Sequence, residues 1–437
     1  MAVEKQSAQW FESLLFPEIF KTFRMAIQPS KLIIAFLTIS VICISGWLMD
    51  FSRTVVATPD TQSRVTELDT YLANPDRLDS YIEVFSQTGD RTGVFTTLWH
   101  LISQRYHHAL RALFDFNLTD VAQDGEVCFM ALGWALQHHL IYCIIFCIIG
   151  HAVFSIAGGA ICRIAALQFA QGEKPGLTEA IRFGFRKFPS FFAAPLVPIS
   201  TILFAGLFIV LIGLAGNIPK AGEMIVGLLL PIVLLAGAFI AFVSIGAIAG
   251  FNLMSPSIAY DGLDCYDAIS RTFNYVYVRP WRMGFYTAIG AVYGSVCYLF
   301  VRLFAFLLIL VARCFLEIGI WVENEAGAGK LAALWPKPHL GSLLGSRITT
   351  PVSWSENAAA AIIYLFLLVV VGTVVSFIVS FYFSANTIIY ALMRHRVDET
   401  TLDIVCRHSE DMLAETVPTQ PGFNKTQTSQ DSPRYEE

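Results

Sequence analysis

Residues 192–215 read FAAPLVPISTILFAGLFIVLIGLA and contain no charged side chain. A helix of this length rises about 36 Å, because each residue adds about 1.5 Å, and this exceeds the roughly 30 Å of hydrocarbon in a bilayer. Water cannot satisfy backbone N–H and C=O groups at that depth, whereas an α-helix satisfies them internally. The stretch is therefore predicted to be a membrane-spanning helix.

Comparable apolar stretches recur along the chain. They lie at about residues 32–48, 141–162, 224–250, 284–310 and 362–390. The chain is 55% hydrophobic and only 14% charged, whereas proteins on average contain about 25% charged residues. These features predict an all-α membrane protein with about six transmembrane helices. Several of the stretches are longer than one span needs, so seven or eight spans are the alternative.

The positions of lysine and arginine predict which ends of the spans face the cytoplasm, because cytoplasmic flanks retain positive charge. The predicted inner segments contain Lys5, Lys21, Arg24, Lys31, Arg163, Lys174, Arg182, Arg186, Lys187, Arg271, Arg279, Arg282, Arg394, Arg396 and Arg407. The short outer loops contain only Lys220, Lys330, Lys337 and Arg347. We therefore expect both the N-terminus and the C-terminus to be cytoplasmic. The formal net charge of −5 argues against a nucleic-acid partner, which would call for a basic face.

The spans divide the chain into segments of different character. We expect a cytoplasmic amphipathic segment at 1–31, a first span at 32–49, an extracytoplasmic helical domain at 50–126, five further spans within 127–393, and a cytoplasmic tail at 394–437. Within the outer domain, apolar residues at helical spacing predict a helix at about 93–114, and a second helix is expected near 62–73. The tail after about 415 has a composition typical of disorder.

A recurring unit predicts a threefold organisation. An amphipathic segment with aromatic and basic residues ends at a proline, and a span follows; the prolines are Pro29, Pro189 and Pro280. Such a segment suits a helix that lies in the headgroup layer, and proline then ends that helix and turns the chain into the bilayer. The predicted fold is therefore three repeats of a surface helix plus two spans, with surface helices near 176–188 and 264–279. Aromatic and basic residues also flank most membrane helices, which is the alternative explanation.

Glycines within the spans suggest close helix packing. Gly246 and Gly250, and likewise Gly290 and Gly294, are four residues apart and offer faces where helices can approach closely. Glycine is common in membrane helices in general, so the pattern is open to both interpretations.

The densest polar pattern near the membrane is a set of acids and arginines between the fourth and fifth stretches. Its members are Asp261, Asp264, Asp267, Arg271, Arg279 and Arg282. Asp264, Asp267 and Arg271 share one helical face, with the acids about one turn before the base. These residues are candidate contacts for a lipid headgroup or a protein partner. The alternative is an intramolecular ion-pair network that ties the inner loops together.

Ionisable residues inside spans are costly, so they are candidate functional residues. His151 lies near the middle of the second stretch and Arg302 lies inside the fifth. A path through the membrane near these residues is one hypothesis, but no span has an acid near its centre, which argues against proton coupling. Arg313 and Glu317 are one turn apart and are expected to pair near the outer surface.

The sequence offers no catalytic or cofactor signature. His100, His107 and His108 share a polar helical face, but the pattern lacks the cysteine or carboxylate ligands of a metal site. We therefore expect no metal, no cofactor and no enzymatic activity.

The stretch from Gly158 to Arg282 carries a resemblance. It contains GGAICRIAALQ, AIRFGFRKFP and DAISRTFNYVYVRPWR, and it resembles uncharacterised multi-spanning membrane proteins of planctomycete-type bacteria. It is more distantly similar to YciC-like proteins and to the membrane part of some glycerophosphodiesterases, in which a comparable motif precedes a span. The resemblance covers about a third of the chain. It implies a bacterial inner-membrane location and transfers no catalytic residue.

These observations favour a non-enzymatic inner-membrane protein that organises or assists envelope components. Its partners are expected to be membrane lipids, together with proteins that contact residues 51–125 and the cytoplasmic amphipathic helices. The alternative is a transporter or lipid-handling permease with a path near His151 and Arg302.

Overall fold

The computed structural model describes residues 16–58, 65–86, 89–219, 221–322, 329–340, 343–345 and 353–405. Within these residues the chain is almost entirely helical, and six helices are long and apolar enough to span a membrane. They are α3 (Pro29–Met49), α8 (Leu140–Gln171), α10 (Phe188–Ala215), α11 (Ala221–Asp261), α13 (Pro280–Gly319) and α15 (Trp354–Val397). The predicted fold class is therefore confirmed.

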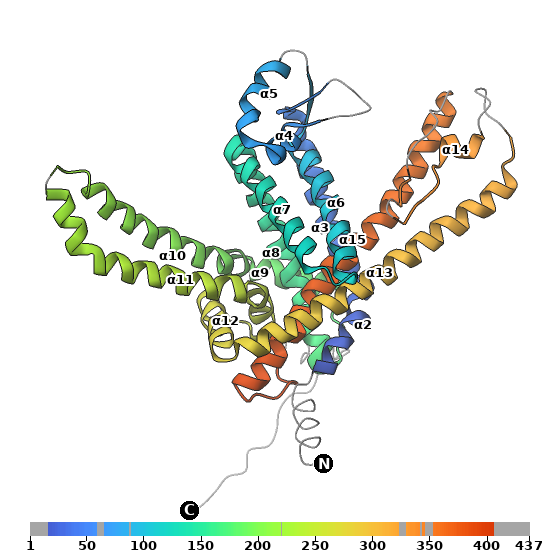
Figure 1. Cartoon of the computed structure of the whole chain (residues 1–437). Helices are drawn as coiled ribbons and strands as arrows, with labels where there is room; N and C mark the ends of the chain where they lie inside the picture. The colour runs from blue at the N-terminus through green and yellow to red at the C-terminus, as the bar shows by residue number, and fades with distance from the viewer. Residues whose placement is uncertain are drawn as a thin grey trace, which may run out of the picture.

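The six long helices form three antiparallel pairs that we call arms. The α3–α8 arm stands upright in Figure 1, and the α10–α11 and α13–α15 arms slant away from it on either side. A short helix precedes each arm: α2 (Thr22–Ala26, continuing from η1, Phe16–Lys21), α9 (Leu177–Arg186) and α12 (Cys265–Val278). All three short helices lie at the end where the arms converge, which we call the basal end.

Each arm begins at one of the three recurring prolines. Pro29 and Pro280 are the first residues of α3 and α13, and Pro189 is the second residue of α10. Proline suits the first turn of a helix because its missing N–H has no intrahelical acceptor there and its φ is already helical. The predicted unit of a short helix, a proline and a span is thus present three times.

The slanting arms contain the longest helices. α11 and α15 have 41 and 44 residues, whereas α3 has 21. A helix of 41 residues is about 61 Å long, twice the hydrocarbon thickness, and a long apolar helix fits a bilayer by tilting. The slant of these arms in Figure 1 agrees with the length of α11, α13 and α15 if all three arms cross the same membrane.

The core lies at the basal end, where the arms meet. On α8, residues 157–167 are buried, and on α15 so are residues 383–394. Small residues make this packing possible: a Cβ on Gly158 would lie 2.6 Å from the Phe383 ring, and one on Gly159 would lie 2.5 Å from the Phe191 ring. Away from the base the arms separate, and the outer half of α11 has no buried residue over an 18-residue window.

Side chains of neighbouring helices pack directly against several glycines of the spans. Gly246 faces the Phe273 ring and Gly250 faces Thr272, so these glycines accommodate α12 against α11. Three glycines along the α10–α11 arm have no such role. A Cβ at Gly206, Gly213 or Gly237 would meet no atom within 4 Å. The expected close packing thus occurs near the base and not along the whole arms.

The outer region contains η2 (Asp50–Ser52), the paired strands β1 (Val55–Ala57) and β2 (Asp90–Thr92), and the helices α4 (Glu67–Ala73), η3 (Pro75–Arg77), α5 (Leu78–Phe85), α6 (Val94–Phe114) and α7 (Leu118–His138). A small apolar cluster that includes Leu68, Leu78 and Trp134 holds it together. The helices expected at about 93–114 and near 62–73 correspond to α6 and α4. The other short helix, α14 (Lys330–Leu334), lies in the loop between α13 and α15.

The α6–α7 hairpin connects this region to the spans. Asp50, at the outer end of α3, accepts hydrogen bonds from the backbone N–H groups of Phe95 (3.0 Å) and Thr96 (2.9 Å) and so caps the start of α6. Further along α6, Tyr106 and His107 contact Tyr298 in the middle of α13. The hairpin therefore extends from the outer region to the side of the α13–α15 arm (Figure 1).

The structure leaves some segment predictions untested. α15 continues past residue 393, to Val397, and the chain is described to Val405. Residues 1–15 and the tail after 415, which was expected to be disordered, lie outside the described residues.

Candidate functional site

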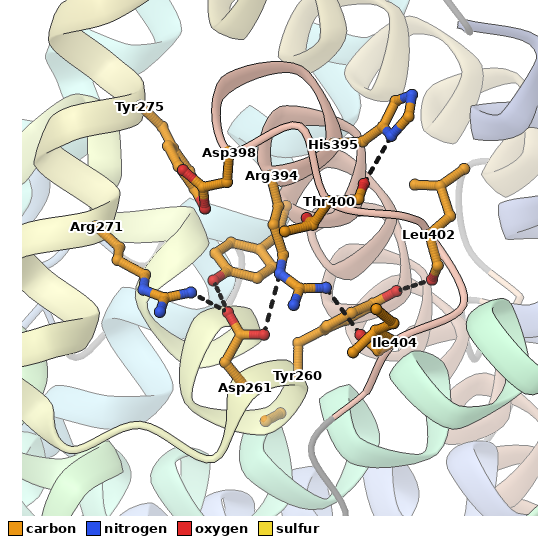
Figure 2. Close-up of polar contacts among 12 residues, drawn as sticks. Tyr260, Asp261, Arg271, Tyr275, Arg394, His395, Asp398, Thr400, Leu402 and Ile404 are labelled. Carbon is orange, nitrogen blue, oxygen red and sulfur yellow. Dashed lines mark hydrogen bonds and ion pairs between the residues drawn. The ribbon is translucent and has the colours of Figure 1, made fainter.

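The polar residues at the basal end form a buried network around Asp261, the last residue of α11. Its carboxylate lies 2.9 Å from Nη1 of Arg271 and 3.2 Å from Nε of Arg394, and it accepts a hydrogen bond from the Tyr390 hydroxyl. We call these four residues the basal network (Figure 2). Since they belong to α11, α12 and α15, the network joins the ends of α11 and α15 to the middle of α12.

The chain after α15 is attached to the same place. The Tyr260 hydroxyl donates to the carbonyl of Leu402, and Nη1 of Arg394 donates to the carbonyl of Ile404 at 2.8 Å. The Tyr275 hydroxyl donates to the carboxylate of Asp398. Figure 2 shows how residues 398–404 wrap around Arg394.

Burial determines the electrostatics of this network. The side chain of Asp261 is 7% exposed and that of Arg394 is 10% exposed. The guanidinium of Arg394 also lies 5.3 Å from the ring centroid of Tyr260, a cation–π contact. Burial, together with the hydrogen bond to Asp398, raises the pKa of Tyr275, so its hydroxyl stays protonated and donates.

The six residues predicted near this place divide into three groups. Asp261 and Arg271 come together as an ion pair. Asp264 lies 3.6 Å from Nζ of Lys187 and is 79% exposed. The others lie around these: Asp267 and Arg279 are exposed, and Arg282 is half-buried. The structure thus places two of the six in an internal network, as the alternative interpretation of the motif described, and leaves three at the surface.

Sequence reasoning missed Arg394, Tyr390, Tyr260 and Tyr275 as members of the site. Tyr390 and Arg394 are four residues apart and share one face of α15. This spacing is the one feature of the sequence that could have placed them in the same site. Nothing in the sequence indicated that this face meets the end of α11.

A second site lies where the arms diverge. A cavity of about 420 Å³, which we call the junction cavity, lies between α8, α10, α11 and α15. It is lined by His151, Phe154, Ser155, Phe191, Pro195, Phe251, Asn252, Met254, Ser255, Ile378, Val379, Tyr382 and Phe383. Most of these side chains are apolar, and the polar ones are a histidine, an amide and three hydroxyls.

A neighbouring cavity of about 280 Å³ lies against α13 and α15, and we call it the α13 cavity. It shares Asn252, Ile378 and Tyr382 with the junction cavity. The Tyr382 hydroxyl donates to Oδ1 of Asn252 at 2.5 Å, and this bond joins α15 to α11 between the two cavities. Tyr106 of the α6–α7 hairpin also lines the α13 cavity.

The two intramembrane candidates have different environments. His151 lines the junction cavity, with Nε2 lying 2.9 Å from the carbonyl oxygen of Phe192. Arg302 is buried and donates to the carbonyl of Leu340 from Nε (2.9 Å) and Nη2 (2.6 Å), and to the Tyr298 hydroxyl from Nη1 (3.0 Å). Arg302 therefore anchors the loop between α13 and α15, and the structure does not bring it into one cavity with His151.

The outer end of α13 shows the expected pair. Nη1 of Arg313 lies 2.9 Å from Glu317, and Nε of Arg313 donates to the carbonyl of Trp335 at 3.1 Å. The predicted Arg313–Glu317 contact is confirmed.

The lining of both cavities resembles that of a ligand-binding pocket. Among the described residues, no group of three His, Cys, Asp or Glu side chains is placed to hold a metal ion. Ligand pockets are typically apolar with a few polar groups that orient the ligand, and both cavities fit that description.

Comparisons with models of known families, with curated proteins and with solved structures found no match to this chain. The resemblance to planctomycete-type membrane proteins therefore stays an expectation from the sequence.

Proposed function

We propose that this protein is a non-enzymatic integral membrane protein that binds a lipid and handles it within the bilayer. The observation that carries the proposal is the junction cavity, which lies among the spans and is lined mainly by apolar side chains. Its volume of about 420 Å³ lies within the range of roughly 300–1,000 Å³ of small-molecule sites.

The lining supports an acyl chain as the occupant. Its lining includes the aromatic side chains of Phe154, Phe191, Phe251 and Phe383. A charged or strongly polar substrate would lose its hydration there without gaining enough partners. An acyl chain loses no hydrogen bonds on entry, and the few polar groups are available to orient its ester end.

Tyr382 and Asn252 line both this cavity and the α13 cavity, and a hydrogen bond joins them. The pair of cavities is therefore consistent with passage of a chain from one to the other, which is the step that a lipid-handling permease needs.

We further propose that the membrane is a bacterial inner membrane, that the basal end is cytoplasmic, and that both termini lie there. The distribution of lysine and arginine supports the orientation. The sequence resemblance supports the location.

A second candidate function is the organisation of envelope components, and the α10–α11 arm favours it. Large apolar side chains along its outer half are exposed, among them Phe204 (77%), Leu228 (81%) and Leu235 (72%). Such a surface suits lipid or the spans of a partner protein. A photo-crosslinker at Leu235 distinguishes these, because only a partner gives a discrete protein adduct in native membranes and lipid gives none.

A cavity-filling variant tests the lipid proposal. Val379→Trp places a large ring in the junction cavity, and we expect the purified protein to lose co-purified lipid in native mass spectrometry. Val369→Trp is the matched control, because Val369 lies on the same helix, is 46% exposed and faces outward. Equal lipid occupancy in the two variants would refute the proposal.

A further inference from the structure

A third cavity, at the basal end, has the opposite character to the junction cavity. It has a volume of about 210 Å³ and lies between α9 and the end of α8. It is lined by Arg163, Pro175, Thr178, Glu179, Ala180, Arg182, Phe183 and Arg186. We call it the arginine cavity, since three of its side chains are guanidiniums.

The deepest of the three arginines is held in place. Arg163 is 7% exposed, and its Nη1 donates to the carbonyl of Ala259 at 3.1 Å. Its guanidinium lies 4.8 Å from the ring centroid of Phe183, and that of Arg186 lies 6.0 Å from the same ring. The Phe183 ring thus serves as a common platform, and stacking of this kind pre-orders guanidiniums.

The charge of the lining favours an anion. The lining contains three guanidiniums and one carboxylate, that of Glu179, so arginines outnumber acids in it. The first turn of α9 contributes in the same direction, because Thr178 and Glu179 line the cavity and Gly176 provides no side chain to cap the helix. Uncapped N–H groups and the helix dipole attract negative charge.

Phe183 and Phe191 lie between this cavity and the junction cavity. The Phe183 ring packs edge-on against that of Phe191, with centroids 6.2 Å apart. Phe183 lines the arginine cavity and Phe191 lines the junction cavity. A cationic cavity and an apolar cavity therefore lie on either side of one aromatic pair, at the basal end of the same arms.

We propose that the arginine cavity binds a phosphate group and that this group is the headgroup phosphate of a phospholipid whose chain occupies the junction cavity. Guanidiniums bind phosphate oxygens through paired hydrogen bonds, and the apolar cavity beyond Phe191 accommodates the remainder of an amphiphile. The second half of this inference rests on the proposed function, and it names the class of lipid.

The test measures equilibrium binding to the purified full-length protein in detergent micelles, with three probes. Dioctanoyl phosphatidic acid has both a phosphate and chains, dioctanoylglycerol has chains alone, and inorganic phosphate has no chain. We expect Arg182→Gln to weaken binding of dioctanoyl phosphatidic acid by at least about tenfold and to leave dioctanoylglycerol unchanged. Arg24→Gln is the matched control, because Arg24 is an exposed arginine of the basal helix α2 outside the cavity.

The other outcomes separate the two proposals. If Arg182→Gln binds dioctanoyl phosphatidic acid as the unmodified protein does, or if Arg24→Gln is equally weakened, the arginine cavity is not the phosphate site, whatever Val379→Trp does to lipid occupancy. If inorganic phosphate binds and is lost in Arg182→Gln while neither lipid binds, the phosphate site stands, its source is free phosphate, and the assignment to a phospholipid is overturned together with the proposed function.

Discussion

The carboxylate of Asp261 lies 3.2 Å from the guanidinium of Arg394, which joins the last residue of α11 to the last turn of α15. Both side chains are almost fully buried, and Arg271 approaches the same carboxylate from α12. The negative charge of Asp261 thus lies against the positive charges of two arginines, at the end where the three arms converge. This ion pair joins the α10–α11 arm to the α13–α15 arm at the base, while the outer halves of these arms remain apart.

Removing this acid should destabilise the whole protein. Asp261→Asn leaves Arg394 buried without a counter-charge, and breaking a buried pair in this way costs about 3–5 kcal/mol. We expect a clearly lower midpoint of thermal unfolding in micelles. Asp264→Asn is the control, because that side chain is 79% exposed and its loss should change stability by less than about 1 kcal/mol. Equal midpoints for the two variants would contradict the role given to Asp261.

The packing of α8 against α10 should be sensitive to a single methyl group. A Cβ at Gly159 would lie 2.5 Å from the Phe191 ring, so Gly159→Ala forces that ring to move. Overpacking of this kind costs about 1–3 kcal/mol. Gly206→Ala, in the outer half of α10, meets no atom within 4 Å and should be neutral or slightly stabilising. Unfolding midpoints in micelles measure both, and a loss confined to Gly206→Ala would be inconsistent with the packing described.

The contact between the α6–α7 hairpin and α13 should weaken in acid. Nδ1 of His107 lies 2.6 Å from the carbonyl of Ser103, and its Nε2 lies 3.3 Å from the Tyr298 hydroxyl, which also accepts from Arg302. A neutral imidazole fits this series of hydrogen bonds, because Nδ1–H donates to the carbonyl of Ser103 and Nε2 accepts from the Tyr298 hydroxyl. Burial, and then the charge of Arg302 and that of Arg111, lower the pKa of His107.

Because the fold lowers the pKa of His107, acid should reduce the stability of the folded protein. The unfolded state takes up a proton near the ordinary histidine pKa of about 6.5, whereas the folded state resists it, so stability is full above that pH and falls below it. We expect limited proteolysis of the hairpin to accelerate at pH 5 relative to pH 7.5, and His107→Gln to reduce that difference. His100→Gln, at an exposed position of the same helix, should retain it. A pH response that is unchanged in His107→Gln would assign the effect to other groups.

The orientation has a direct test. Reporter fusions after Asp90, in the outer region, and after Thr400, at the basal end, should report opposite compartments, with Thr400 in the cytoplasm. The reason is that arginine and lysine concentrate at the basal end and are retained on the inner face. Activity of both reporters in one compartment would overturn the arrangement of the spans.

The sequence predicted the spans and their starting points. The stretch 192–215 has to be helical in a bilayer whatever surrounds it, because its backbone has no other source of hydrogen bonds. Pro29, Pro189 and Pro280 begin their helices for a reason confined to one residue, the absence of an N–H. Arg313 and Glu317 meet because they are one turn apart on the same helix.

The features that could be predicted are therefore local: six apolar helices, the short helices before them, and the ends that carry positive charge. Three others appear only once the helices are packed: Asp261 is compensated by Arg394, the arms diverge to leave an apolar cavity beside His151, and Phe183 and Phe191 divide that cavity from three arginines. The physical reason is that hydropathy and helix geometry act over a few residues, whereas ion pairs and cavities depend on how distant helices pack, and many packings satisfy the same apolar pattern.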